Sequence, residues 1–165
     1  MSGEEVTLIQ MLDCRERRSH FQKELLKKYH CPVISFCMNI PGPIKTNKSI
    51  CSAFNKGKEA LFQSLAEKSA VICEFVEIHE ATGDELLAAV KLSAEELKAL
   101  TTAIENTHPV GRLFDMDVID TDGQKLSRSD FRKCILCGRQ AQECSRMRRH
   151  TVREMQDKIE EILGK

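Results

Sequence analysis

The segment from Gly111 to Asp120 places acidic residues inside an otherwise apolar run, Gly-Arg-Leu-Phe-Asp-Met-Asp-Val-Ile-Asp. Successive side chains of a β-strand point to opposite faces, so Asp115 and Asp117 would share one face and their apolar neighbours the other. Aspartate is disfavoured in strands, and two like charges on one face repel each other. The segment therefore predicts a half-buried strand with a carboxylate pair on its polar face.

Two explanations fit this pair. Hard cations such as Mg²⁺ prefer one or two carboxylates together with phosphate oxygens, so Asp115 and Asp117 are candidate magnesium ligands. An edge strand with a wet outer face would also carry two aspartates, for solubility alone. The spacing does not separate the two explanations, so the rest of the chain must.

Apolar periodicity and turn residues divide the remaining chain into helices and strands. The spacing of apolar residues predicts helices over residues 11–29, 47–68 (with a bend or break at Gly57), 93–107 and 151–163. Ser93 with Glu96 and Thr151 with Glu154 are capping boxes that begin the last two. Runs rich in strand-favouring residues predict strands over 33–40, 71–79, 85–91 (returning antiparallel after a turn at 82–84) and a short return strand over 125–127.

These elements predict an α+β fold with a mainly antiparallel sheet and helices packed on it. The length of 165 residues fits one domain, residues 1–165. No stretch of the sequence is long and apolar enough to be read as a membrane span, and the first residues lack the pattern of a secretory signal. We therefore expect a cytoplasmic protein that does not bind a membrane, with its eight cysteines present as thiols.

Charge is balanced overall but unevenly distributed. The chain has 25 basic and 25 acidic residues, so no global field would recruit nucleic acid. The stretch from Arg128 to Arg153, however, holds eight basic and two acidic residues. This end of the domain is predicted to attract an anion.

Three further clusters could take part in chemistry. The loop Asn39-Ile-Pro-Gly-Pro-Ile-Lys45 follows a strand and would aim Lys45 outward, although a structural turn with a solvated lysine explains it too. Arg146, Arg148, Arg149 and His150 form a cluster suited to phosphate, or an exposed basic helix face. The third set, Cys134, Cys137, Cys144 and His150, could bind zinc or be a packed or reactive thiol cluster, because its spacing is irregular after the first pair.

Taken together, these motifs resemble the apo-citrate lyase phosphoribosyl-dephospho-CoA transferase family. The resemblance rests on residues 39–45, on His-Pro-Val-Gly-Arg-Leu-Phe-Asp-Met-Asp-Val at 108–118, on Arg-Lys-Cys-Ile-Leu-Cys at 132–137, and on Cys-Ser-Arg-Met-Arg-Arg-His with Ala141 before it at 144–150. It extends from about residue 12 to residue 162. It implies a transferase that joins 2'-(5''-triphosphoribosyl)-3'-dephospho-CoA to a serine of the citrate lyase acyl carrier subunit and releases diphosphate.

The residues in place suggest roles in this reaction. Asp115 and Asp117 would be catalytic and hold one or two Mg²⁺ ions, with a third carboxylate from Asp120, Asp122, Glu74 or Glu77. Candidate contacts to the phosphates of the substrate are Lys45, Arg112, Arg132, Lys133, Arg146, Arg148, Arg149 and His150. The aspartate pair is also similar to that of nucleotidyltransferases, which adds a nucleotidyltransferase-like arrangement to the fold expectation. Their preceding Gly-Ser is missing here, where Gly111 stands four residues before Asp115.

Two other functions compete with this one. A zinc-stabilised nucleic-acid-binding module would use the basic segment, but the neutral charge and the single tyrosine argue against it, and we expect no nucleic-acid partner. A non-catalytic subunit that binds the carrier protein would leave Asp115 and Asp117 without a role.

Overall fold

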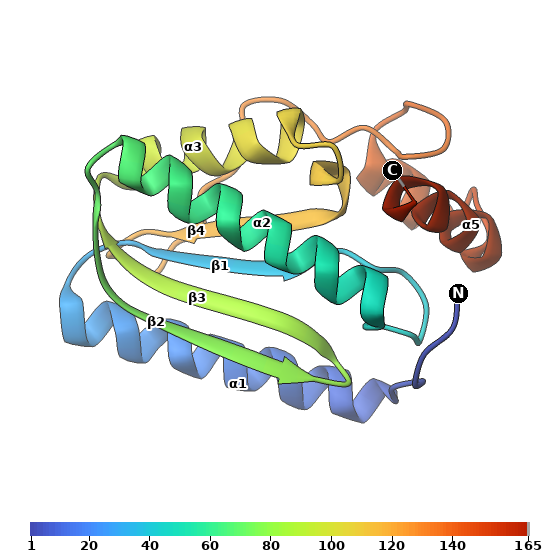
Figure 1. The fold of residues 1–165 in the computed structure, drawn as a ribbon, viewed down its shortest axis with the longest axis horizontal. Helices are drawn as coiled ribbons and strands as arrows, with labels where there is room; N and C mark the ends of the chain where they lie inside the picture. Colours follow the sequence, from blue (N-terminus) through green and yellow to red (C-terminus); the bar gives the residue numbers. More distant parts are fainter. Residues whose placement is uncertain (165) are drawn as a thin grey trace.

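The computed structural model describes residues 1–164, which form a four-stranded antiparallel sheet with helices on both faces (Figure 1). In the order β2-β3-β1-β4, the strands are β2 (Val71–Glu80), β3 (Gly83–Lys91), β1 (Val33–Met38) and β4 (Phe114–Ile119). The helices are α1 (Leu8–Tyr29), α2 (Lys48–Glu67), α3 (Ala94–Thr107), α4 (Ala141–Arg146) and α5 (Val152–Leu163), with a 3₁₀ turn η1 (Gly111–Leu113) before β4. The predicted α+β class is confirmed.

The two faces of the sheet are covered by different helices. Figure 1 shows α1 on one face and α2 with α3 on the other. On the second face Phe36, Met116 and other alternate strand residues are fully buried in the main core, together with apolar residues of α2, α3 and α5. On the first face Val33 and Leu87 pack with Leu25 of α1 in a smaller cluster. Burying each large apolar side chain contributes roughly 1.5–3 kcal/mol, so the main core dominates stability.

Gly57 does not bend or break α2, so that prediction is wrong. The helix runs through it without interruption, and a Cβ atom at this position would lie 2.6 Å from Cζ of Phe36 and 2.8 Å from Cζ of Phe114. The glycine therefore allows two aromatic rings of the sheet to approach the helix backbone. Those rings pack edge to face, with 5.3 Å between their centroids.

Other boundaries differ from the predictions in smaller ways. Helix α1 begins at Leu8, not at residue 11, because Thr7 and Gln10 form a capping box. The predicted strand over residues 125–127 is absent from this described part of the chain. An isolated bridge between Ile119 and Lys125 takes its place.

The C-terminal part begins with an irregular segment and returns to the core in α5. Its residues Ile159 and Ile162 are buried in the main core, and Val152 meets the loop after β1 at Gly42. The predicted capping box of Thr151 and Glu154 is confirmed, as is that of Ser93 and Glu96. Among residues 1–164 the structure has no helix with both the length and the apolar character that crossing a membrane requires. That residues 1–165 form one domain stays a prediction.

Candidate active site

The carboxylate pair lies on the edge strand β4, as the alternation predicted. Phe114, Met116 and Val118 are fully buried on the core face, whereas Asp115 and Asp117 point to the opposite face. The register with β1 sets Cys37 beside Asp115 and Ser35 beside Asp117. The pair is not simply solvated: 26% of the Asp117 side chain is exposed, and Asp115 is half-buried. This burial counts against a role in solubility alone.

The outer edge of β4 is closed by three side chains, and the sequence analysis missed two of them, Glu105 and Lys98. The backbone N–H of Met116 donates to Oε1 of Glu105 at 2.8 Å, and Nζ of Lys98 donates to the carbonyl of Met116 at 3.3 Å. Arg132 donates to the carbonyl of Phe114. Both Glu105 and Lys98 come from α3, so one helix satisfies the edge of the strand.

Asp115 and Asp117 open into a cavity of about 560 Å³, which we call the carboxylate cavity. Its charged lining residues are Lys98, Glu105, Asp115, Asp117, Lys125, Arg128, Asp130 and Arg132. Four of these are basic and four are acidic. A polyphosphate could be bound here by the basic groups only if a cation also offset the aspartates.

The surroundings of the pair disfavour the ionised form of Asp115. Burial raises the pKa of Asp115, and the neighbouring charge of Asp117 raises it further, against the opposing effects of Arg132 and Lys125. Nζ of Lys125 lies 2.9 Å from Oδ2 of Asp117. Burial would lower the pKa of Lys125, but its hydrogen bond to Asp117 and the charges of Asp117 and Asp115 together outweigh burial, and that pKa is raised.

Glu105 orients two arginines at the rim of the cavity. Its Oε2 accepts from Arg128 at 2.9 Å, and its Oε1 lies 3.5 Å from Arg132. Burial raises the pKa of Glu105 in spite of both arginines. The Nε atoms of Arg128 and Arg132 are buried and have no hydrogen-bond partner in the described chain. These two donors are unpaired but expose almost no surface, so they are not open to an anion in the cavity.

A second cavity, of about 650 Å³, adjoins the first, and we call it the arginine cavity. Asn39, Arg132, Ala141 and Ser145 line both cavities, so the two are neighbours. Its other polar lining includes Arg112, Arg148 and His150, and none of residues 1–164 contributes a carboxylate to it. Its apolar lining includes Leu113, Ile135, Val152 and Met155. This combination suits a ligand with both phosphate and apolar parts.

The structure does not bring every predicted residue to these cavities. Lys45 lines neither: its Nζ donates to the carbonyl of Ile40 at 2.7 Å, and burial and the charge of Arg15 lower its pKa. Lys133, Arg146 and Arg149 also line neither cavity. None of the proposed third carboxylates lines either cavity. The further carboxylates that line the carboxylate cavity are Glu105 and Asp130.

The four carboxylates proposed as a third metal ligand lie elsewhere in the fold. Glu74 and Glu77 lie on β2, at the opposite edge of the sheet, and pair with Lys28 and Lys58 respectively. Asp120 and Asp122 accept backbone hydrogen bonds in the turn after β4. Within residues 1–164, no three ligand-type side chains including the aspartate pair meet closely enough to form a metal site.

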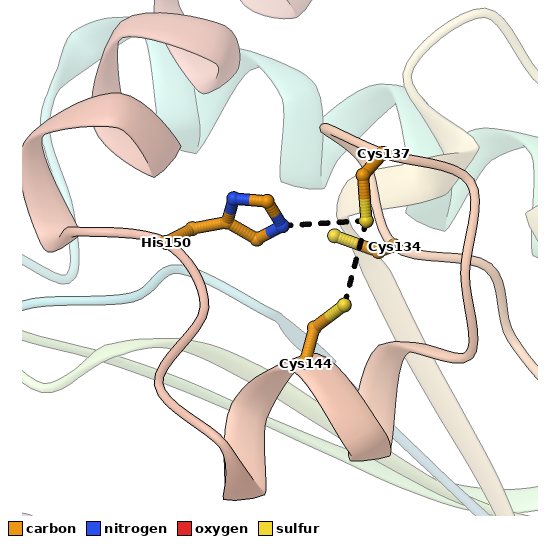
Figure 2. Close-up of side chains that lie close together, drawn as sticks. All are labelled: Cys134, Cys137, Cys144 and His150. Carbon is orange, nitrogen blue, oxygen red and sulfur yellow. Dashed lines mark hydrogen bonds between the residues drawn. The ribbon is translucent and has the colours of Figure 1, made fainter.

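The predicted cysteine and histidine cluster does come together (Figure 2). Side chains of Cys134, Cys137, Cys144 and His150 point toward a common centre, and their ligand atoms all lie within 4.8 Å of one another. Burial would raise the pKa of the Cys134 thiol, but hydrogen bonds from the backbone N–H groups of Leu136 and Cys137 and from neighbouring thiols lower it overall.

Comparison with known proteins agrees with the resemblance seen in the sequence. The chain is 39% identical to a probable apo-citrate lyase phosphoribosyl-dephospho-CoA transferase of Vibrio cholerae, over 95% of the chain and 91% of the relative. A protein of Streptococcus pyogenes with the same name is 36% identical, over 98% and 88%. The apo-citrate lyase phosphoribosyl-dephospho-CoA transferase of Shigella boydii is 33% identical, over 96% and 89%. The profile of one family matches residues 6–165. The chain belongs to the apo-citrate lyase phosphoribosyl-dephospho-CoA transferase family.

Proposed function

We propose that this chain attaches the phosphoribosyl-dephospho-CoA group to a serine of the acyl carrier subunit of citrate lyase. The donor would be 2'-(5''-triphosphoribosyl)-3'-dephospho-CoA. The serine oxygen forms a bond to the phosphorus nearest the ribose, the bond from that phosphorus to the diphosphate breaks, and the serine proton is released. Family membership supports the reaction, and the cavity that brings Asp115 and Asp117 together with Arg128 and Arg132 carries the assignment of its site.

The two aspartates of the carboxylate cavity fit a magnesium ion that is held by two carboxylates and substrate phosphates, not one held by three protein side chains. Asp115 and Asp117 are hard oxygen ligands two residues apart on one strand face, and burial and the charge of Asp117 together raise the pKa of Asp115. These two residues would hold Mg²⁺, which when bound offsets the charge of the triphosphate and of the departing diphosphate. Lys125 offsets part of the charge of Asp117 through its ion pair.

Arginines of this chain would position the donor across both cavities. Arg132 lines both, so it suits the triphosphate, whose charge is the largest on the donor. Arg128 lines the carboxylate cavity and would contact the same triphosphate. Arg112 and Arg148 line the arginine cavity and suit the nucleotide end of the donor. Guanidinium groups bind phosphate oxygens in pairs, which gives orientation as well as affinity.

The competing functions receive less support. A nucleic-acid-binding module would present a basic surface, yet Asp115, Asp117 and Asp130 lie among the basic residues of the carboxylate cavity. A carrier-binding subunit without chemistry leaves the two half-buried aspartates unexplained. The cytoplasmic location stays a prediction, which the eight free cysteines favour.

The test is a transfer assay read by the mass of the carrier protein. Apo carrier, donor and enzyme are incubated with and without Mg²⁺, and the carrier is weighed. We expect the mass of the donor less diphosphate to be added only with Mg²⁺, and not at all to a carrier whose acceptor serine is alanine. Asp117→Asn should abolish the gain while leaving the fold intact, because it removes charge but little volume.

Asp122→Asn is the matched control. Asp122 lies five residues further along and uses one oxygen to accept from the backbone N–H of Gln124, a role that asparagine can retain. We expect this variant to transfer at the wild-type rate. Normal turnover of Asp117→Asn, or full activity without a divalent cation, would contradict the assigned site.

A further inference from the structure

The segment between β4 and the end of α5 has almost no core of its own. From residue 121 to residue 158, Cys134 and Cys144 alone are buried. A stretch that buries so little apolar surface usually needs a disulfide, a metal ion or a large neighbour to stay ordered. The buried side chains here are two thiols, and each faces another potential ligand.

Two distances within the cluster are close to those of a tetrahedral zinc site, and all of its ligand atoms lie within 4.8 Å of one another. Sγ of Cys137 lies 3.5 Å from Sγ of Cys144, and Nε2 of His150 lies 3.4 Å from Sγ of Cys137. Ligands at about 2.3 Å (sulfur) and about 2.0 Å (nitrogen) from a tetrahedral zinc ion are separated by roughly 3.5–3.8 Å. Figure 2 shows that the four side chains approach from three directions: the turn at 134–137, helix α4, and the residue before the cap of α5.

The turn that holds the first two thiols is shaped for a metal-bound sulfur. The backbone N–H of Gly138 donates to the carbonyl of Cys134 at 3.2 Å, and Gly138 has a φ of +71° that most other residues would adopt only with strain. Backbone N–H groups of Leu136 and Cys137 point at the sulfur of Cys134. Such donors stabilise a thiolate, the form of cysteine that binds metals.

We infer that Cys134, Cys137, Cys144 and His150 bind one zinc ion that serves as the core of the segment from 121 to 151. Three thiolates and an imidazole suit zinc, and four protein ligands close the coordination sphere, so the site is structural. It is separate from the aspartate pair, whose hard oxygen ligands suit magnesium.

The zinc ion would also position residues of the proposed active site, and this part rests on the proposed function. Arg132 precedes the ligand Cys134 by two residues, and Arg148 precedes His150 by two. Both arginines line the arginine cavity, as do Cys134, Cys144 and His150 themselves. One ion would therefore fix the wall of the cavity and the phosphate-binding groups on it.

Metal analysis tests the site without reference to activity. Protein purified in reducing buffer without chelator, after zinc loading and desalting, should contain about one zinc ion per chain. Cys137→Ser should retain less than about a tenth of that amount, since it removes one of four ligands. Cys51→Ser is the matched control, because Cys51 is a half-buried thiol of α2 outside the cluster, and it should keep its zinc.

A second pair of variants guards against loss of zinc through misfolding. His150→Ala removes a ligand, whereas His150→Cys replaces the imidazole with a thiolate, so the first should lose zinc and the second should retain it. Circular dichroism of each variant reports whether the sheet and long helices persist. Zinc below a tenth of an equivalent in loaded wild-type protein would overturn the inference, and so would a disulfide between Cys137 and Cys144 in that protein.

Limited proteolysis tests the role of the ion as a core. Trypsin cleaves after lysine and arginine, and the segment offers Arg139, Arg146 and other basic sites that are exposed. Stripping zinc with a thiol-compatible chelator should speed cleavage within 128–149 at least about tenfold, and added zinc should restore protection. Equal cleavage rates with and without zinc would show that the ion does not order the segment.

Discussion

Replacing Asp115 by asparagine should stabilise the protein while abolishing transfer. Asp115 and Asp117 share one strand face two residues apart, which separates their side chains by roughly 6.6 Å. Two unit charges at that distance repel by about 2.5 kcal/mol at an effective dielectric constant of about 20. Lys125 and the partial exposure of Asp117 offset part of this repulsion, so we expect a net gain of about 1 kcal/mol in the free energy of unfolding.

The raised pKa of Asp115 also fixes how the stability difference between wild type and variant changes with pH. Because the pKa of Asp115 is raised in the folded state, the folded protein binds that proton more tightly than the unfolded chain. The ionised side chain therefore lowers stability as pH rises through its folded pKa. The advantage of Asp115→Asn should be present at neutral pH and should vanish as the pH falls toward about 3, where the wild-type carboxyl is protonated.

Urea denaturation in magnesium-free reducing buffer, at pH 7 and at low pH, measures the difference. For a chain of this size about 1 kcal/mol corresponds to roughly 2–4 °C in the midpoint of thermal unfolding. Added Mg²⁺ should stabilise the wild type more than the variant, because ion binding to the folded state shifts the equilibrium. A less stable variant at pH 7, or one that still modifies the carrier protein, would refute the reasoning.

Further predictions concern the arginines and the core. Arg132→Lys should lower kcat/KM for the donor at least about 100-fold, because lysine cannot form paired bonds to phosphate, whereas Arg149→Ala, which lies outside both cavities, should change it by less than about threefold. Full activity of Arg132→Lys, or loss of activity in Arg149→Ala, would contradict the roles assigned to these two arginines. Gly57→Ala should lower the free energy of unfolding by about 1–3 kcal/mol, since the added methyl meets Phe36 and Phe114, and an unchanged urea midpoint would contradict this packing.

Features encoded locally were predictable from the sequence. The capping boxes at Ser93 and Thr151 mark where α3 and α5 begin, and the alternation around Asp115 assigns the faces of β4. The predicted bend at Gly57 is wrong because this glycine of α2 makes room for two aromatic rings from strands β1 and β4, a contact that no local pattern reveals. Propensity treats a helical glycine as a break, but close packing can require one.

The candidate site was predictable in part for the same reason. Its aspartates and the cysteine cluster have local spacing, whereas Glu105 acts through contacts with residues 11 to 27 positions away in the chain. An acidic residue on an amphipathic helix resembles any solvated charge until the fold buries it. Short α4 was missed because Gln140 at its N-cap makes no side-chain capping hydrogen bond.

The closed border of β4 limits how an acceptor protein can reach Asp115 and Asp117. Outward-facing backbone groups of Phe114 and Met116 are already occupied by Arg132, Glu105 and Lys98. A peptide from another polypeptide cannot extend the sheet here without displacing them. The serine to be modified must therefore arrive on a folded surface or a protruding loop, recognised through side chains, and its neighbours in sequence need not be extended.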